Sequence, residues 1–215
     1  MPIKPKRWAF TPVAGSATNI SAAATPAGAG ALTLGGALAS GGVVPDLGLA
    51  YYLLLTTVSD ESTKTITITG TNNDGAAQVE SATALPNATT KSSVKAFRSI
   101  SSITVSAATT GDVSIGTMNA TASIISPAMP LDVYSKDTVI ATDISGTINF
   151  TIQKCYEMLN RGQTANWLTA EAAGAIDVVT TLTASVSAIR FIVTSYTNGA
   201  TIALNVSQAG YIDLE

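Results

Sequence analysis

The side chains that most often carry enzyme chemistry are sparse in this chain of 215 residues. It has no histidine and a single cysteine, Cys155, so a Ser-His-Asp or Cys-His nucleophile would have no imidazole base within the chain. Zinc, copper and non-haem iron sites rely on imidazole and thiolate ligands, and the composition therefore disfavours them. We expect Cys155 to act as a small hydrophobic residue, because no histidine is present to activate its thiol.

The remaining candidates for chemistry are fourteen acidic residues, since a glycosidase needs only two carboxylates. Segment 71–75 (TNNDG) has oxygen-bearing side chains but lacks the downstream glutamate of an EF-hand calcium loop. The glycines of segment 28–42 form neither a P-loop nor a dinucleotide fingerprint. We therefore predict no catalytic residue, no metal and no cofactor. Acids that we place at predicted turns, where Asp commonly binds its own backbone, are Asp60, Glu61, Asp74, Asp112, Asp143 and Asp177.

The surface implied by the composition is unusually uncharged. Charged residues make up 12% of the chain, about half of the roughly 25% in an average soluble domain. The hydrophobic share of 46% is enough for a core, so the chain is not a disordered polar tract. A surface of Ser, Thr, Ala, Asn and Gly suits a protein whose faces are covered by partners in its working state.

Nucleic acids and membranes are not expected partners. The pI of about 4.9 differs from that of a nucleic-acid binder with a basic face. The most apolar stretch, residues 47–55, is far shorter than the ~20 residues of a membrane helix. The start of the chain has basic residues but no apolar segment of a secretory signal, so we expect a soluble protein made in a cytoplasm.

From residue 51 onward, β-branched residues and period-two alternation predict strands, most clearly in segment 65–69 (TITIT). Roughly ten to twelve strands, with turn signals every 8–12 residues, predict an all-β fold: an antiparallel β-sandwich, jelly-roll-like, as one or two small sandwiches. We place the first unit at 46–130 and the second at 131–215, with one continuous domain as the alternative. One helical turn is expected at 154–159. Hairpins are predicted at the turns 73–75, 110–112, 145–146 and 198–199.

Residues 1–45 are predicted to form an extended N-terminal arm, because their Ala/Gly-rich composition cannot build a core of its own. Large aromatics are common anchors at interfaces, so we predict that the arm orders on a partner subunit; the alternative is a flexible tail. Removal of residues 1–24 would then leave the β body folded and weaken binding to the partner. The predicted partner-binding residues are Lys4, Lys6, Arg7, Trp8 and Phe10.

Five segments, in their order and spacing, resemble a group of all-β structural proteins from the virions of tailed bacteriophages. The chain departs from that group after the TGTNNDG turn, where it continues as Val79-Glu80-Ser81-Ala82, and in its basic and aromatic start. The segments are 25–43 (TPAGAGALTLGGALASGGV), 65–81 (TITITGTNNDGAAQVES), 97–117 (FRSISSITVSAATTGDVSIGT), 146–156 (GTINFTIQKCY) and 188–210 (AIRFIVTSYTNGATIALNVSQAG).

This resemblance implies a non-enzymatic structural protein of a phage virion, assembled in the bacterial host cytoplasm. A small β-sandwich with an arm suits a head decoration, or cement, protein that binds the major capsid protein or other virion proteins and stabilises the capsid. Copies of the chain are expected to associate with each other as a dimer or trimer. Two alternatives remain: a tail, collar or baseplate component, and a carbohydrate-binding β-sandwich or adhesin, which would need exposed aromatic platforms.

Overall fold

The computed structural model describes residues 5–85, 90–118, 124–132, 137–157, 164–173 and 176–208. Strands make up 62% of the structure, and these ranges contain no helix. The paired strands are antiparallel and form open sheets, which confirms the predicted all-β, sandwich-like fold. In this part of the chain no helix has the length and apolarity needed to cross a membrane.

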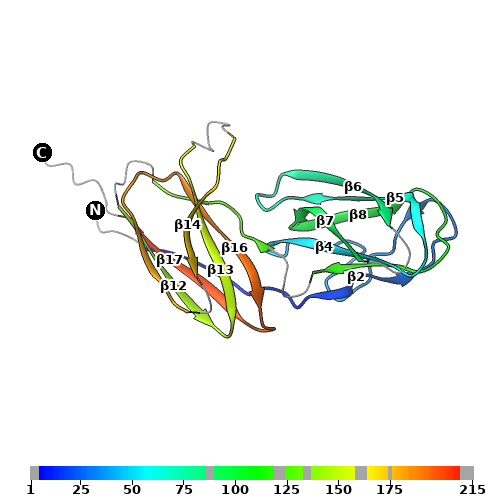
Figure 1. The fold of residues 1–215 in the computed structure, drawn as a ribbon, viewed down its shortest axis with the longest axis horizontal. Helices are drawn as coiled ribbons and strands as arrows, with labels where there is room; N and C mark the ends of the chain where they lie inside the picture. Colours follow the sequence, from blue (N-terminus) through cyan, green and yellow to red (C-terminus); the bar gives the residue numbers. More distant parts are fainter. Residues whose placement is uncertain are drawn as a thin grey trace, which may run out of the picture. The chain divides into compact units, whose positions relative to one another are not determined.

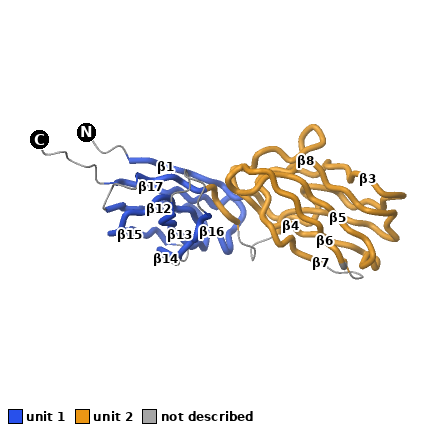
Figure 2. Tube along the Cα trace, turned by 90° about the horizontal axis from the view of Figure 1, so that it is seen from above, with its two compact units in different colours: residues 1–12, 128–215 blue, residues 13–127 orange. Residues whose placement is uncertain are grey.

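The chain folds as two compact units, which Figure 2 shows in different colours. Unit 1 combines Met1–Pro12 with Ala128–Glu215, and unit 2 is Val13–Pro127. The later boundary lies close to the predicted division at residue 130. The earlier boundary divides the predicted arm, so that the start of the chain belongs to unit 1 and the rest of residues 1–45 to unit 2.

Unit 1 is a sandwich of two antiparallel layers (Figure 1). The first layer has the order β1-β17-β12-β15; in the second, β13 lies between β14 and β16, and β11 pairs with β16. Apolar residues of β17 and β16 alternate with more polar ones and are buried between the layers. The strands are β1 (Lys6–Phe10), β11 (Met129–Pro130), β12 (Thr138–Ser145), β13 (Ile148–Cys155), β14 (Leu168–Ala173), β15 (Val179–Leu182), β16 (Ala188–Tyr196) and β17 (Thr201–Gln208).

Unit 2 is a second sandwich. One layer has the order β3-β8-β5-β6; in the other, β4 lies between β7 and β9, β9 pairs with β2, and β10 also pairs with β4. A cluster of buried apolar side chains from both layers forms its core. The strands are β2 (Ser16–Ala24), β3 (Gly30–Ala31), β4 (Ala50–Thr57), β5 (Glu61–Thr71), β6 (Ala77–Leu85), β7 (Thr90–Phe97), β8 (Ser99–Val105), β9 (Val113–Thr117) and β10 (Ile124–Ile125).

The predicted arm is integrated into both sandwiches of its own chain. Strand β1 pairs with β17 in unit 1, and β2 pairs with β9 in unit 2. Ile20 is fully buried, and Leu32, Leu34 and Val44 join the same core. The Ala/Gly-rich segment has too few large side chains for a core of its own, but these few complete a core that other strands supply. The expectation that residues 1–24 can be removed without loss of the β body must therefore be revised.

Of the four predicted hairpins, only the one at residues 73–75 forms, between β5 and β6. The other three predictions are wrong, because β8 and β9, β12 and β13, and β16 and β17 each lie in different layers. Their turns carry the chain from one layer to the other. The helical turn predicted at 154–159 is wrong at its start, because β13 continues to Cys155. Residues 158–159 of that prediction lie outside the described residues.

Side chains connect the facing edge strands β6 and β7 of unit 2. The buried Glu80 carboxylate of β6 accepts hydrogen bonds from the backbone N–H groups of Val94 (2.7 Å) and Lys95 (2.8 Å) of β7. Gln78 donates to the Ala96 carbonyl at 2.9 Å, and Lys95 donates to the Val79 carbonyl at 2.7 Å. Backbone groups that an edge strand would expose are thus occupied within the unit, which protects this side of the sandwich from strand addition.

Replacement of Glu80 by Ala is expected to lower the free energy of unfolding of unit 2 by about 1–3 kcal/mol. The variant leaves two backbone N–H groups of β7 without their acceptor. Denaturant unfolding of Glu80→Ala measures the loss, and Thr104→Ala, at an exposed position of β8, is the matched control. Equal stabilities of the two variants would contradict this role of Glu80.

Candidate functional site

The predicted partner-binding residues form an edge strand of unit 1. Lys6, Trp8 and Phe10 pair in register with Val206, Leu204 and Ile202 of β17, all of which are buried. Cross-strand partners lie on the same face of a sheet, so these three residues lie on the inner face of the layer, where Lys6 is nevertheless exposed. Trp8 and Phe10 are accordingly half-buried, whereas Arg7 and Ala9 lie on the outer face and are exposed. Lys4 lies outside the described residues.

Each described side chain of this set, from Lys6 to Phe10, has a contact within its own chain. The Phe10 ring meets Phe191 of β16 edge-on, with ring centroids 5.1 Å apart. Lys6 donates to the Pro130 carbonyl at 3.4 Å, and its Nζ lies 6.0 Å from the Trp8 ring centroid. The two aromatics thus help to close the core of unit 1. That β1 also binds a partner remains a prediction.

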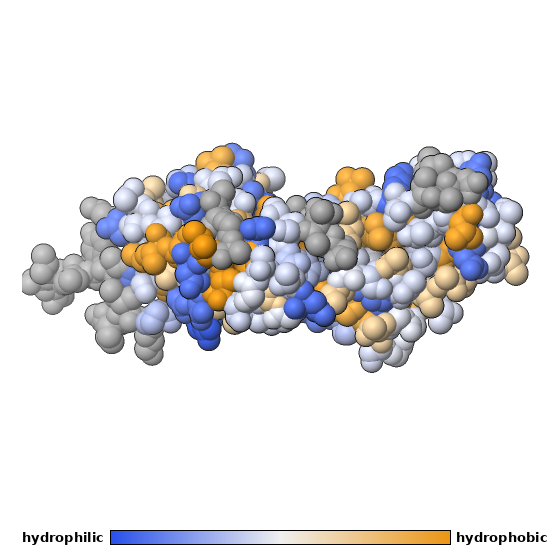
Figure 3. Space-filling view, turned by 60° about the horizontal axis from the view of Figure 1, so that its bottom comes forward, coloured by the Kyte–Doolittle hydropathy of each residue, from blue (hydrophilic) through white to orange (hydrophobic). Residues whose placement is uncertain are grey.

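The outer face of the β1-β17-β12-β15 sheet is built mainly from small and uncharged side chains, with one ion pair among them. Arg7 on β1 reaches across β17 to Asp143 on β12, with Nη2 and Oδ2 3.0 Å apart. On β17, Asn205 is opposite Arg7 and Ala203 is opposite Asp143, and Ala203 is only 3% exposed. Val139 and Val179 on the same face are 37% and 74% exposed. Figure 3 shows that hydrophobic groups, in orange, are exposed on the drawn surface beside hydrophilic ones, in blue.

A hydroxyl-rich face lies on the sheet β3-β8-β5-β6 of unit 2. Alternate threonines of β5 pair with Ser and Thr residues of β8 on one side, and with Thr83, Ser81, Val79 and Ala77 of β6 on the other. The Thr67 and Ser81 hydroxyls are 3.2 Å apart, and those of Thr71 and Ser99 are 2.7 Å apart. Short side chains that hydrogen-bond to each other leave a face with little relief and no charge of its own.

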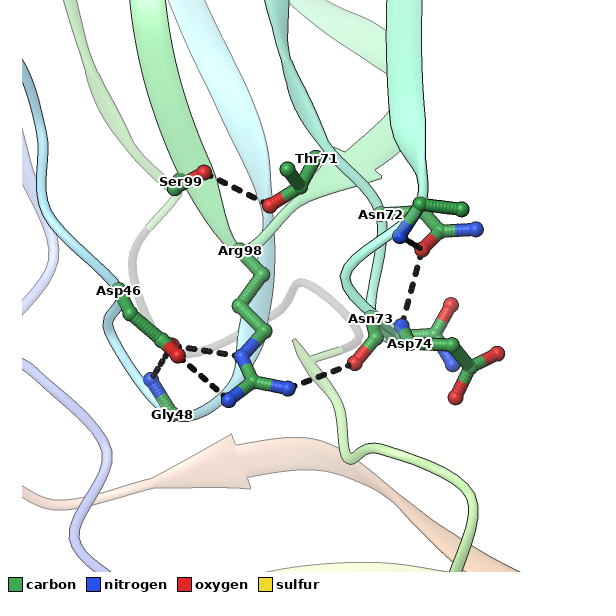
Figure 4. A network of polar contacts seen from close by, with 9 residues as sticks. Asp46, Gly48, Thr71, Asn72, Asn73, Asp74, Arg98 and Ser99 are labelled. Atoms are coloured by element: carbon green, nitrogen blue, oxygen red, sulfur yellow. Dashed lines mark hydrogen bonds and ion pairs between the residues drawn. The ribbon is translucent and has the colours of Figure 1, made fainter.

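A polar network fixes one end of unit 2 (Figure 4). The Arg98 guanidinium binds both carboxylate oxygens of Asp46, at 2.6 and 2.5 Å, and donates to the Asn73 carbonyl at 3.3 Å. Hydrogen bonds from Arg98, and then from the Gly48 N–H, hold the pKa of the Asp46 carboxyl below its ordinary value. The network joins the loop before β4 to the β5–β6 hairpin, and we assign it a structural role.

The carboxylates considered as catalytic candidates have structural partners. Asp60 accepts from the Ser62 N–H (2.9 Å), and Asp177 from the Ile144 N–H (2.8 Å). The Asp112 carboxylate accepts from the Thr25 hydroxyl at 2.5 Å. Two positions differ from the prediction of turns, because Glu61 begins β5 and Asp143 lies within β12.

Glu61 is a buried carboxylate. Its Oε1 accepts from the N–H groups of Thr110 (2.7 Å) and Gly111 (3.0 Å), and its Oε2 lies 2.7 Å from the Lys64 ammonium. Burial raises the pKa of Glu61, but the hydrogen bonds from Lys64 and from the two N–H groups outweigh burial, so the net pKa is lowered. The ionised form thus ties the start of β5 to the loop before β9.

Acid is therefore expected to weaken unit 2 through Glu61. The folded-state pKa lies below the ordinary value of 4.5. The stabilisation is thus complete above that pH and is lost as the pH falls through the folded-state pKa. Urea unfolding of the wild type and Glu61→Gln from pH 7 to about pH 3 tests this expectation. The wild type should be the more stable protein at pH 7, and the difference should shrink in acid. A difference that is independent of pH would rule out this linkage.

Cys155 is fully buried, in agreement with its predicted role as a small hydrophobic residue. Its sulfur lies 3.0 Å from a Glu157 carboxylate oxygen, and the Ser187 hydroxyl donates to the Cys155 carbonyl at 2.9 Å. Burial, followed by the hydrogen bond to Glu157, raises the pKa of the thiol. A raised pKa keeps the sulfur protonated and unreactive.

In the oxygen-rich turn at 71–75, the Asn72 side chain binds backbone groups of the hairpin itself. The Asn72 Oδ1 accepts from the N–H groups of Asp74 and Ala76, both at 2.9 Å. Among the described residues, no group of three or more Cys, Asp or Glu side chains is arranged to hold a metal ion.

Trp167 is the large aromatic that a carbohydrate site on unit 1 would use. The Arg190 guanidinium stacks on its ring, 4.3 Å from the centroid, and donates to Gln153 at 2.8 Å. One ring face of Trp167 is therefore covered by this chain rather than presented as an open platform.

Sequence reasoning missed two side chains that hold unit 2 together. Asn19 is buried on β2, where its Nδ2 donates to the Thr117 hydroxyl (2.7 Å) and its Oδ1 accepts from the Thr117 N–H (2.9 Å). In the sequence, Glu80 stands out only as part of a departure from the phage group. No local signal marks either residue, because their partners lie on strands distant in sequence or across the sandwich edge.

The sequence matches no known protein-family profile and no curated protein.

Proposed function

We propose that the chain is a non-enzymatic structural protein of a phage virion, and that it decorates the head by binding the major capsid protein and copies of itself. The observation that carries the proposal is the character of the two outer sheet faces. The face of unit 1 has small side chains, exposed valines and one ion pair, and the face of unit 2 is lined by hydroxyls. Faces with little charge and little relief suit the close contacts of a permanent assembly.

The resemblance of five segments to virion structural proteins of tailed phages supports the same conclusion and indicates the phage virion as the assembly. The network of Arg98 and the carboxylate of Glu61 stabilise unit 2 itself. Head decoration is preferred over a tail, collar or baseplate role, because two small sandwiches with broad uncharged faces fit a repeated, flat lattice.

Quantitative mass spectrometry of purified particles tests this proposal. A head decoration protein should be present in roughly hundreds of copies, whereas about six to eighteen copies would indicate a ring in the tail, collar or baseplate. Absence of the chain from purified particles would overturn the virion assignment. Binding of the purified protein to a glycan array, together with that absence, would instead favour the carbohydrate-binding alternative.

A further inference from the structure

Strand β1 has an unusual connection to its own sandwich. The other described strands of unit 1, β11 to β17, follow one another along the chain, but the whole of unit 2 stands between β1 and β11. Val13 is already fixed in unit 2, because its N–H donates to the Tyr51 hydroxyl at 3.0 Å. Only Thr11 and Pro12 separate that anchor from the end of β1. A short connection between two folded parts favours exchange of an element between copies.

Strand β17 needs a neighbouring strand at this edge, and that strand can come from the same chain or from a second copy. Without β1, strand β17 would become an edge, with free backbone N–H and C=O groups along residues 202–206. The buried Ile202 and Leu204 would lose their neighbours Phe10 and Trp8. An identical β1 from a second copy restores every one of these contacts.

The contacts of β1 determine its register on β17, but they contribute little to the stability of the pairing. Arg7 and Asp143 form a 3.0 Å ion pair, but their side chains are 59% and 62% exposed. Such exposed pairs contribute about 0–1 kcal/mol, so the pair selects one alignment on β17 without locking it. Trp8 and Phe10 are only half-buried, and β1 has five residues at the border of its sheet. Short edge strands of this kind belong to the least stable parts of a fold.

Three border strands of unit 2, namely β6, β7 and β2, contrast with β1. Glu80, Gln78 and Lys95 connect β6 to β7. On the other side, β2 is fixed by Asn19 and by the fully buried Ile20. Exchange is therefore expected at β1 and not at these strands.

We propose that β1 is an exchange strand: in assemblies of this chain, Lys6–Phe10 of one copy pairs with β17 of a second copy in the register that it has within one chain. The inference deepens the self-association part of the proposed function and rests on that proposal for its setting. The strand exchange is tested on purified protein, whereas the location in the virion is tested by the number of copies per particle. Failure of the exchange would therefore not decide the location.

Disulfide trapping between two full-length variants tests the exchange. Ala9 and Ala203 are register partners on the outer face, so Ala9→Cys in one tagged chain and Ala203→Cys in another can be joined only if β1 crosses between copies. The control pairs Ala9→Cys with Ser207→Cys, which lies four residues further along β17. Wild-type chains control for the buried Cys155.

We expect a mixed disulfide dimer of Ala9→Cys and Ala203→Cys chains, formed several-fold more than the dimer with Ser207→Cys. The double variant Ala9→Cys/Ala203→Cys carries both cysteines in every chain and should form the bond in each copy, which shows that the geometry allows it. Equal trapping at Ala203 and Ser207, or no mixed dimer although the double variant forms its bond, would overturn the proposal.

A second measurement does not depend on disulfide geometry. Trp8 is replaced by photoreactive benzoylphenylalanine, and heavy-isotope and light chains are mixed and irradiated. Adducts between residue 8 and β17 that join heavy to light peptides show exchange. If every such adduct joins peptides of one isotope, β1 stays in its own chain and the proposal is wrong.

Discussion

Removal of residues 1–24 is expected to unfold unit 2, whereas removal of residues 1–12 is expected to leave unit 2 folded. The longer deletion takes away β2, including the fully buried Ile20 and the buried Asn19 that binds Thr117 twice. Loss of a buried Ile side chain alone costs about 2–5 kcal/mol. Two lost hydrogen bonds to Thr117 add to this cost, and the total stability of a domain is only about 5–15 kcal/mol.

The shorter deletion removes β1 and affects unit 1 alone. Hydrogen–deuterium exchange of the two truncated proteins, followed by peptide, separates the effects. In the chain that begins at residue 13, peptides of β4 and β9 should keep wild-type protection, and peptides of β17 should lose protection. In the chain that begins at residue 25, peptides of β4 and β9 should exchange freely. Wild-type protection of β9 in that second protein would show that β2 is dispensable.

Replacement of Gly116 by Ala is expected to be among the most damaging single substitutions in unit 2. Strand β9 passes so close to β2 that a Cβ at residue 116 would collide with the backbone carbonyl of Ser16 and with Ala17. Backbone atoms cannot rotate away as a side chain can, and the nearby pair of Asn19 and Thr117 holds the strands together. We expect a loss of about 1–3 kcal/mol or more in the free energy of unfolding.

Gly28→Ala provides the matched control, because a Cβ at residue 28 meets no atom within 4 Å. Its stability should stay within about 0.5 kcal/mol of the wild type. Denaturant unfolding of both variants measures the difference. If Gly116→Ala is as stable as Gly28→Ala, the close approach of β2 and β9 is not a constraint on this fold.

Local patterns predicted strands well, because alternation is set by the burial of one face. Segment 65–69 lies within β5, and the predicted turn at 198–199 lies between β16 and β17. The missed strand β2 has mainly small or polar residues, and β1 has basic and aromatic ones; the burial of both depends on strands far away in sequence. No property of their own residues indicates those neighbours.

Strand pairing could not be predicted from turn chemistry. Asn198-Gly199 is a strong hairpin signal, and Gly199 has the expected positive φ of 81°. Yet β16 pairs with β13, and β17 pairs with β12. The turn reverses the direction of the chain tightly. Strands β16 and β17 nevertheless lie in different layers, because each has apolar residues that it buries between the layers. The Asp74-Gly75 turn produced a hairpin because β5 and β6 share one layer.

The sequence predicted a partner-binding role for Lys6, Arg7, Trp8 and Phe10, and that role stays a prediction. The structure shows these residues in one strand of unit 1, with the Phe10 ring against Phe191 of the same chain. Within a single chain the aromatic rings fit unit 1, because β17 offers an edge and Phe191 offers a ring to pack against. Composition alone could not distinguish this fit from binding to another subunit, since an exchanged strand makes identical contacts.

Cryo-electron microscopy of the intact phage particle tests the central claim most directly. The proposed function predicts density for both sandwiches at many symmetry-related positions on the outside of the head, in contact with the major capsid protein. Density for the chain at the tail or at a single vertex alone, or no density in the particle, would contradict it.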